Sequence, residues 1–171
     1  MKINLLISVI IIFISLSTIA FAQSFRDKVI ISPDVSFLWN FQRGFEELYR
    51  FVKFTQSMKI VYSLDLADRR VGEMELLIDK NRTDYVIFAE SEYEREINNI
   101  EFELNSTGEF DIIEILESVK SVNKTDVIHR LQVQIKVLGD IITKVPEYLK
   151  DLIFNAAKKS SKLIGVLSKT L

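Results

Sequence analysis

The stretch that decides the fold is IVYSLDLADRRVGEMELLI, residues 60–78. Its apolar positions recur at intervals of four and three residues, which is the period of one face of an α-helix. This stripe comprises Ile60, Leu64, Ala67, Val71, Met74 and Ile78. The same spacing continues through most of the chain on both sides, and no run of useful length alternates as a strand would. The pattern therefore predicts an all-α protein.

Short breaks rich in helix-capping residues divide the chain into further helical segments. Ser32 is the expected N-cap of the first helix, which should end near Phe54, and Thr55 should cap the next. Thr83 is the expected N-cap of a third helix, and Val145-Pro146 should begin the last. The expected buried stripes are Leu38, Phe41, Phe45, Leu48, Val52; Val86, Ala89, Tyr93, Ile97, Ile100, Leu104; Ile112, Leu116, Val119; Ile128, Leu131, Ile135, Leu138, Ile142; and Leu149, Ile153, Ala156, Ser160, Leu163, Leu167.

The first of these helices carries an unusual number of aromatic residues. We expect it to be the most buried helix, and we expect its aromatic side chains to form core rather than a ligand box. They are Phe37, Trp39, Phe41, Phe45, Tyr49 and Phe51.

The links between helices are short, which makes neighbouring helices antiparallel. We therefore predict an up-down antiparallel bundle of five to six amphipathic helices, built from coiled-coil-like hairpins. No low-complexity linker interrupts residues 23–171, so these form one predicted domain.

Residues 1–22 read as an export signal. Lys2 precedes a long uncharged run, and Ala20-Phe21-Ala22 fits a small-x-small cleavage site, so cleavage would fall between Ala22 and Gln23. The alternative is an uncleaved membrane anchor, since about 20 residues at ~1.5 Å each just span a bilayer of ~30 Å. Either interpretation places the domain outside the cytoplasm, as a secreted, periplasmic or cell-surface protein that the N-terminal segment could tether.

Composition excludes several classes of function. The net charge of −2 lacks the basic excess that nucleic-acid binding requires. The chain has no cysteine, so it has no disulfide framework, Cys-ligated metal or thiol nucleophile. No residue pattern indicates a cofactor or a metal site, and we expect none.

Asp65, Asp68 and Glu73 are the candidate acids for an active site, but helical spacing puts them off the apolar stripe. Arg69 stands four residues from both Asp65 and Glu73, as in surface ion pairs worth about 0.2–0.5 kcal/mol each. We therefore expect a solvated face without catalytic residues; an enzyme using these three acids is an alternative.

His129 is the one histidine. Asp126 lies three residues before it, as in a di-iron motif, but such a site needs two copies and further carboxylates. We expect His129 to lie beside the apolar stripe and to hydrogen-bond a neighbouring helix or loop.

Asn81, Asn105 and Asn123 each begin an Asn-x-Ser/Thr sequon, and all three fall at predicted helix boundaries. Exposed boundaries of an exported chain are accessible to N-glycosylation, which we expect there if the host glycosylates. The alternative is that Asn, Ser and Thr gather at helix ends because they cap them.

The last helix sets lysines at 158, 159, 162 and 169 against an apolar side. This pattern fits a bundle helix with a basic end, and it also fits a membrane-surface helix. Contact with a membrane surface could thus involve the N-terminal segment or the C-terminal helix.

Three segments together resemble an uncharacterised envelope domain of archaea and bacteria, the domain-of-unknown-function family 5667. They are SPDVSFLWNFQRGFEELYRFVKFT, LADRRVGEMELLIDKN and VIHRLQVQIKVLGDIITKVPEYLKDLIFNAAKKSS, and the resemblance covers roughly residues 30–162. One departure is TQSM after Phe54, where we expect an Asp-Pro cap. The resemblance implies an all-helical extracytoplasmic module and no particular reaction.

These observations favour a non-catalytic interaction, scaffold or chaperone-like module of the cell envelope that binds a protein partner. The alternatives are a structural subunit that associates with itself through leftover apolar stripes, and an enzyme.

Overall fold

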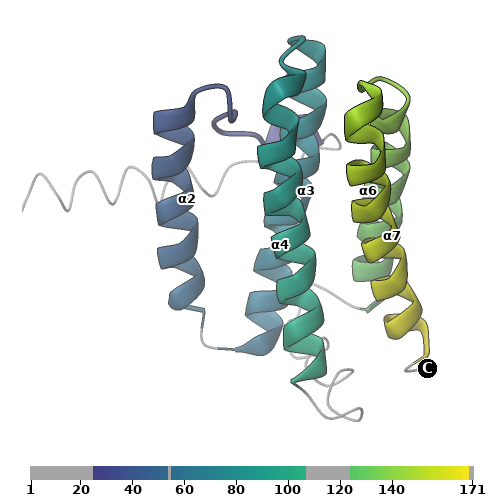
Figure 1. Cartoon of the computed structure of the whole chain (residues 1–171). Helices are drawn as coiled ribbons and strands as arrows, with labels where there is room; N and C mark the ends of the chain where they lie inside the picture. Colours follow the sequence, from purple (N-terminus) through teal and green to yellow (C-terminus); the bar gives the residue numbers. More distant parts are fainter. Residues whose placement is uncertain (1–24, 54, 107–123, 170–171) are drawn as a thin grey trace, which may run out of the picture.

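The computed structural model describes residues 25–53, 55–106 and 124–169. Within these ranges the protein is all-helical, in the order η1 (Phe25–Lys28), α2 (Ser36–Phe51), α3 (Gln56–Asp79), η2 (Thr83–Tyr85), α4 (Val86–Asn105), α6 (Lys124–Ile142) and α7 (Glu147–Lys169). The helices run alternately up and down, which confirms the predicted antiparallel bundle (Figure 1). The predicted helix through Ile112, Leu116 and Val119 lies outside the described residues.

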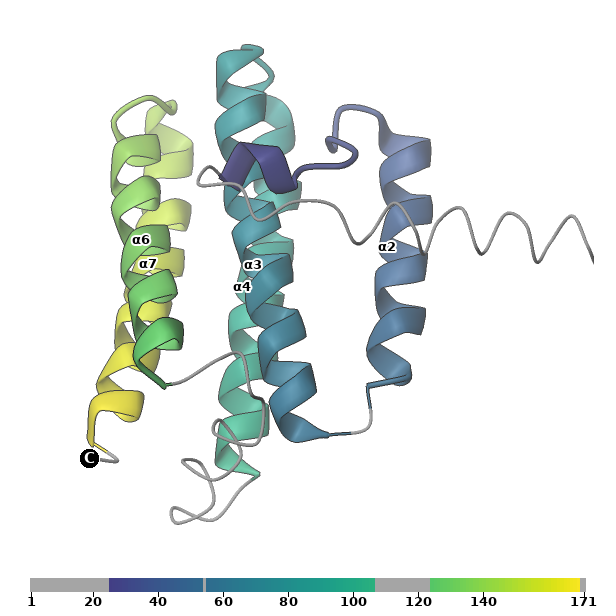
Figure 2. The same ribbon diagram turned by 180° about the vertical axis from the view of Figure 1, so that it is seen from behind.

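Four of the helices enclose the apolar core. α3 packs on α4, α6 on α7, α4 on α7 and α3 on α6, so that they form a closed bundle (Figures 1 and 2). The stripes predicted for α4 and α7 are buried at every position. The α6 stripe is rotated by one residue from the prediction: Val127, Gln134 and Ile141 are buried, while Ile128, Ile135 and Ile142 are half-buried.

The ends of α3 follow from local sequence. Thr55 is its N-cap, as predicted, and the Thr55 hydroxyl accepts a hydrogen bond from the Met58 amide at 3.2 Å. At the other end Asn81 adopts a left-handed φ of 56°, and the Arg82 amide donates to the Leu77 carbonyl at 2.8 Å. This arrangement closes the helix as a Schellman motif.

Two predicted helix starts are displaced. α2 begins at Ser36, so Ser32 is not its N-cap; the Ser32 carbonyl accepts a bond from the Val35 amide in a preceding turn. α4 begins at Val86, and Thr83 instead opens the short η2.

Gly72 admits the N-terminal η1 onto α3. A Cβ at this position would lie 2.2 Å from the Phe25 carbonyl oxygen, so only glycine allows so close an approach. η1 lies across α3 on the side seen in Figure 2.

Candidate functional site

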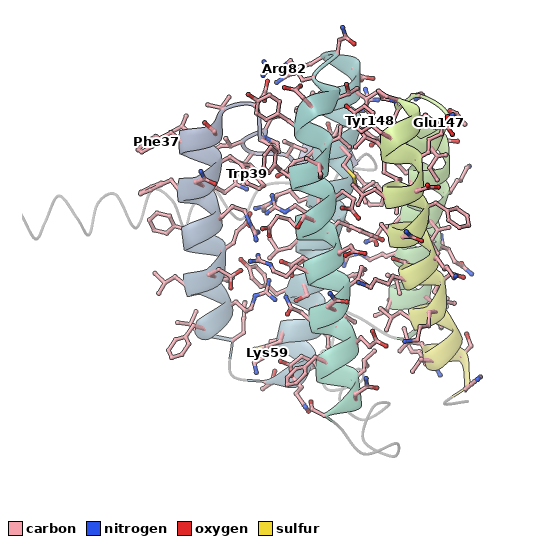
Figure 3. The ribbon with its side chains drawn as sticks, viewed as in Figure 1. Phe37, Trp39, Lys59, Arg82, Glu147 and Tyr148 are labelled. Atoms are coloured by element: carbon pink, nitrogen blue, oxygen red, sulfur yellow. The ribbon has the colours of Figure 1, made fainter. Side chains whose placement is uncertain are left out.

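α2 packs on the bundle with its polar side, and this orientation is the main departure from the sequence prediction. Its backbone stands apart from α3 and α4 (Figure 1), and the buried residues of this helix are Trp39, Gln42, Arg43 and Glu46. Figure 3 shows Trp39 pointing toward α3 and α4, whereas Phe37 points away from them. The expectation that α2 is the most buried helix is therefore wrong.

The outward side of α2 is apolar and aromatic. Phe37 is 78% exposed, Leu48 62% and Phe51 85%, and Leu38, Phe41, Tyr49 and Val52 are also exposed. We call this surface, made by Phe37, Leu38, Phe41, Gly44, Phe45, Leu48, Tyr49, Phe51 and Val52, the outer face of α2. Of the aromatic set expected in the core, only Trp39 is buried, and Phe45 is half-buried.

Glu46 is the centre of the layer between α2 and the bundle. Its carboxylate accepts hydrogen bonds from Arg43 Nη1 at 2.5 Å, from Arg69 Nη1 at 2.6 Å, and from Arg70. Gln42 Nε2 also donates to it at 2.7 Å. One buried carboxylate thus faces three guanidinium groups from two helices, which compensates the cost of its burial.

Arg70 and Glu73 extend this layer into the interior. Both side chains are fully buried and pair at 2.5 Å, and the Trp39 indole donates to Glu73 at 3.2 Å. Burial raises the pKa of Glu73 against the opposing effect of Arg70. Burial alone would lower the pKa of Arg70, but the carboxylates of Glu73 and Glu46 outweigh it and raise that pKa.

α4 contributes acids to the same layer. Arg50 of α2 donates to both oxygens of the buried Glu96, at 2.7 and 2.5 Å. Arg43 pairs with Glu92, and Arg95 links Glu92 to Glu47 of α2. α2 is therefore held by charged groups of α3 and α4 instead of by apolar packing. We call this set of ion pairs the charged layer: Arg43, Glu46, Glu47, Arg50, Arg69, Arg70, Glu73, Glu92, Arg95 and Glu96.

Asp68 forms a second buried polar cluster, on the opposite side of α3. It accepts from Gln134 Nε2 at 2.5 Å, from Arg130 Nε at 3.0 Å and from Lys28. The cluster thus ties α3 to η1 and to α6.

A chain of hydrogen bonds continues from Gln134 through the core. The Tyr93 hydroxyl donates to Gln134 Oε1 at 3.0 Å and shares a bond with Ser160 at 2.6 Å. Burial raises the pKa of Tyr93. Each of the four bundle helices contributes one polar residue to this network, namely Asp68, Tyr93, Gln134 and Ser160. The network therefore fixes how the helices are aligned along their axes.

Of the three candidate acids, only Asp65 lies where the sequence predicts. It is 53% exposed and pairs with Arg130 at 2.6 Å, whereas Asp68 and Glu73 are buried. The sequence predicts surface pairs of Arg69 with Asp65 and with Glu73, but Arg69 pairs with Glu46 instead. The reason is that α2 and η1 cover surfaces of α3 that would be solvated in a simple bundle.

Sequence reasoning missed Arg43, Glu46, Arg50 and Glu96 as interior residues. A signal was present: polar or indole-bearing residues recur at intervals of three or four, at Trp39, Gln42 or Arg43, Glu46 and Arg50, opposite the apolar stripe. Periodicity indicates that α2 has two faces, but it does not say which one turns inward.

Glu90 is a buried acid on α4 without the compensation that Glu46 receives. Its Oε1 has no hydrogen-bond partner among the described residues. Burial, reinforced by Glu94, raises its pKa to about 7, against the opposing effect of Lys159. Lys159 pairs with Glu94 at 3.3 Å, so its charge stabilises an ionised Glu90 less.

The remaining predicted positions are dispersed. Asn81 and Asn105 are exposed at the ends of α3 and α4, about a helix length apart, while Asn123, Ala22 and Gln23 lie outside the described residues. His129 is exposed on α6. The apolar side of α7 is turned into the core, where Leu163 and Leu167 are buried.

The described residues contain no group of three or more His, Cys, Asp or Glu side chains that could hold a metal ion. An open hollow of about 460 Å³ lies beside Phe51, at the end of the outer face, and is lined by Glu47, Arg50, Phe51, Lys53, Lys59 and Glu103. No helix among the described segments combines the length and the apolar content needed to cross a bilayer.

The comparisons with known proteins give one match. A family model described as "Domain of unknown function (DUF5667)" matches residues 30–148, which is more than half of the chain. No curated protein and no solved structure shows a significant match.

Proposed function

This chain belongs to the DUF5667 family, whose function is unknown, and from that premise we propose that it is a non-catalytic interaction module of the cell envelope, with the outer face of α2 as its protein-binding surface.

The observation that carries the proposal is the inverted orientation of α2. A helix with one apolar side gains most stability by turning that side inward, at about 25 cal/mol per Å² of apolar surface removed from water. α2 instead presents Phe37, Leu48 and Phe51 to solvent and is fixed in that orientation by the charged layer. An aromatic surface held outward by buried ion pairs is the arrangement expected of a docking site.

The arrangement of the acids supports a non-catalytic role. A general acid or base must reach a substrate, but Glu73 and Glu46 are buried between helices and paired with Arg70. Asp68 is likewise neutralised by Lys28 and Arg130. The envelope location is supported by the uncharged run after Lys2 and by the Ala20-Phe21-Ala22 pattern.

Site-specific photocrosslinking in the native cell tests the proposal. A photoreactive phenylalanine analogue replaces Leu48 in the outer face, and the matched control places it at Phe154 on α7, which is 59% exposed. We expect protein adducts from position 48 at a yield at least tenfold above position 154. Equal yields from both positions, or adducts with lipid alone from position 48, would refute a protein-binding role for this face.

A further inference from the structure

We infer that the protein bound by the outer face of α2 is a second copy of this chain, whose own α2 packs antiparallel to the first across a two-fold axis near Gly44. This inference rests on the proposed function and makes its partner specific.

The first support is the symmetry of the outer face. Apart from Tyr49 at its edge, its positions are 37, 38, 41, 44, 45, 48, 51 and 52, and the intervals of 1, 3, 3, 1, 3, 3 and 1 residues read the same from either end, about a centre between Gly44 and Phe45. A two-fold contact requires a patch that is complementary to itself. Reversal of α2 about that centre places Phe37 against Val52 of the second copy, next to Phe51, and places Gly44 against Phe45.

Gly44 lies beside the centre of this pattern. It is exposed, and a Cβ there would meet nothing within 4 Å in the monomer, so the position is open to a second helix. In the antiparallel pair the missing side chain lets the two helices approach closely at the axis.

The polar borders of the outer face favour a protein over a lipid surface. Helices that lie on membranes carry lysines and arginines along the edge of the apolar side. Here one border is formed by Ser36, Asn40 and Glu47, and the other ends at Lys53. One cation among these four border residues, in a chain with a net charge of −2, gives little attraction to anionic headgroups.

The exposed area is of the size that a dimer needs. Aromatic side chains have about 150–250 Å² each, so the exposed parts of Phe37, Phe51 and their neighbours amount to on the order of 600 Å². A standard interface takes roughly 800 Å² from each partner. Pairing through α2 therefore covers most of the surface that a stable dimer has to bury.

The hollow beside Phe51 provides a matching contact at each end. In the antiparallel pair the exposed Phe37 ring of one copy comes to the end of α2 where this hollow opens in the other. Lys53 and Lys59 line it and can bind the face of an aromatic ring. The two-fold axis produces this contact twice.

Cysteine crosslinking tests the geometry, because the chain has no cysteine of its own. The variants of the full chain are Gly44→Cys, Phe37→Cys and Phe51→Cys, with Phe154→Cys as control, and they are oxidised in the envelope fraction. A disulfide needs Cα atoms within about 7 Å. We expect Gly44→Cys to crosslink with itself, and Phe37→Cys to crosslink with Phe51→Cys when the two are co-expressed. Phe37→Cys alone should give no dimer, because its two copies lie about 22 Å apart along the helix pair.

A charge exchange tests the same contact without a covalent bond. Leu38→Glu and Leu48→Lys should each raise the dimer dissociation constant at least tenfold, measured by light scattering. Mixing the two variants should restore a heterodimer, because opposite charges then meet across the interface.

The outcomes separate this inference from the proposed function. Self-crosslinking of Phe37→Cys would indicate parallel pairing and overturn the antiparallel model. A chain that stays monomeric at all concentrations, with Leu48 photoadducts to a different protein, would overturn the second copy while leaving the proposed function intact. Binding to vesicles that Leu38→Glu abolishes, without any protein adduct, would overturn both.

Discussion

Arg70 of α3 pairs with Glu46 of α2, and both side chains are withdrawn from water. This contact joins the helix that carries the outer face to the bundle that carries the core. Around it α2 has charged contacts where a bundle helix normally has apolar ones. The attachment of α2 therefore depends on electrostatics to a degree that α4 and α7 do not share.

Glu46→Ala should release α2 from the bundle. Removing one partner of a buried ion pair costs about 3–5 kcal/mol, and here it leaves Arg43, Arg69 and Arg70 short of a carboxylate. Hydrogen exchange should show lost protection over residues 36–51 while α4 and α7 keep theirs. The matched control is Glu47→Ala, which removes an exposed neighbour and should cost less than about 1 kcal/mol. If α2 of Glu46→Ala kept the protection that it has in the unmodified chain, the charged layer would not be what holds it.

Asp68→Asn should destabilise the fold far more than Asp65→Asn. Both acids contact Arg130, but Asp68 is buried and Asp65 is exposed. Neutralising Asp68 leaves Lys28 and Arg130 without their buried counter-charge, which should lower the free energy of unfolding by about 2–4 kcal/mol. Asp65→Asn should change it by less than about 1 kcal/mol. Chemical denaturation measures both values, and similar losses would contradict the difference in burial.

Glu90 should make stability fall as the pH rises. Its pKa in the folded state is about 7, above the ordinary value of 4.5, so between these values the folded state holds a proton that the unfolded state has lost. The favourable contribution is complete below pH 4.5 and is lost as the pH rises through 7. Glu90→Gln should therefore stabilise the protein at pH 8 by about 1–3 kcal/mol and leave it nearly unchanged at pH 4.

The measurement for Glu90 is thermal unfolding of both proteins from pH 4 to pH 8. Glu147→Gln is a suitable control, because Glu147 is exposed on α7 and pairs with Lys150, away from Glu90. An equal gain at pH 4 and pH 8 would show that Glu90→Gln acts through packing and not through titration.

Gly72→Ala should detach η1 from α3. The new methyl group would meet the Phe25 carbonyl at 2.2 Å, so the backbone of η1 must move, and we expect a loss of about 1–3 kcal/mol. Gly139→Ala on α6 meets nothing within 4 Å and should instead stabilise the protein by up to about 1 kcal/mol. Opposite shifts in melting temperature would confirm the difference, and two stabilising substitutions would refute the close contact at Gly72.

Sequence periodicity predicted the bundle well where a helix has one side that must be buried. Every expected position of α4 and α7 is buried, because the alternative side of each is polar and faces water. On α6 the prediction missed Gln134, since a glutamine is buried only if partners such as Asp68 and Tyr93 are in place. Such partners come from distant segments, and spacing along one helix does not reveal them.

The candidate site was beyond reach of the sequence for a related reason. Glu46 and Arg70 are 24 residues apart, and each looks like an ordinary surface charge in its own helix. Their burial follows from how α2 is oriented, which is a property of the pair of helices. The sequence correctly identifies the outer face as an apolar stripe. The stripe was predicted to face the core, because apolar residues are usually buried, but it faces solvent.

The two sides of α2 also differ in how they tolerate substitution. Phe37, Leu48 and Phe51 are exposed, so under the proposed function their substitution would change the partner at little cost to folding. Substitutions at Glu46 or Arg70 must be matched by a second change elsewhere. Substitutions on the outer face of α2 can therefore accumulate singly, whereas the buried ion pairs beneath it have to change together for the fold to be kept.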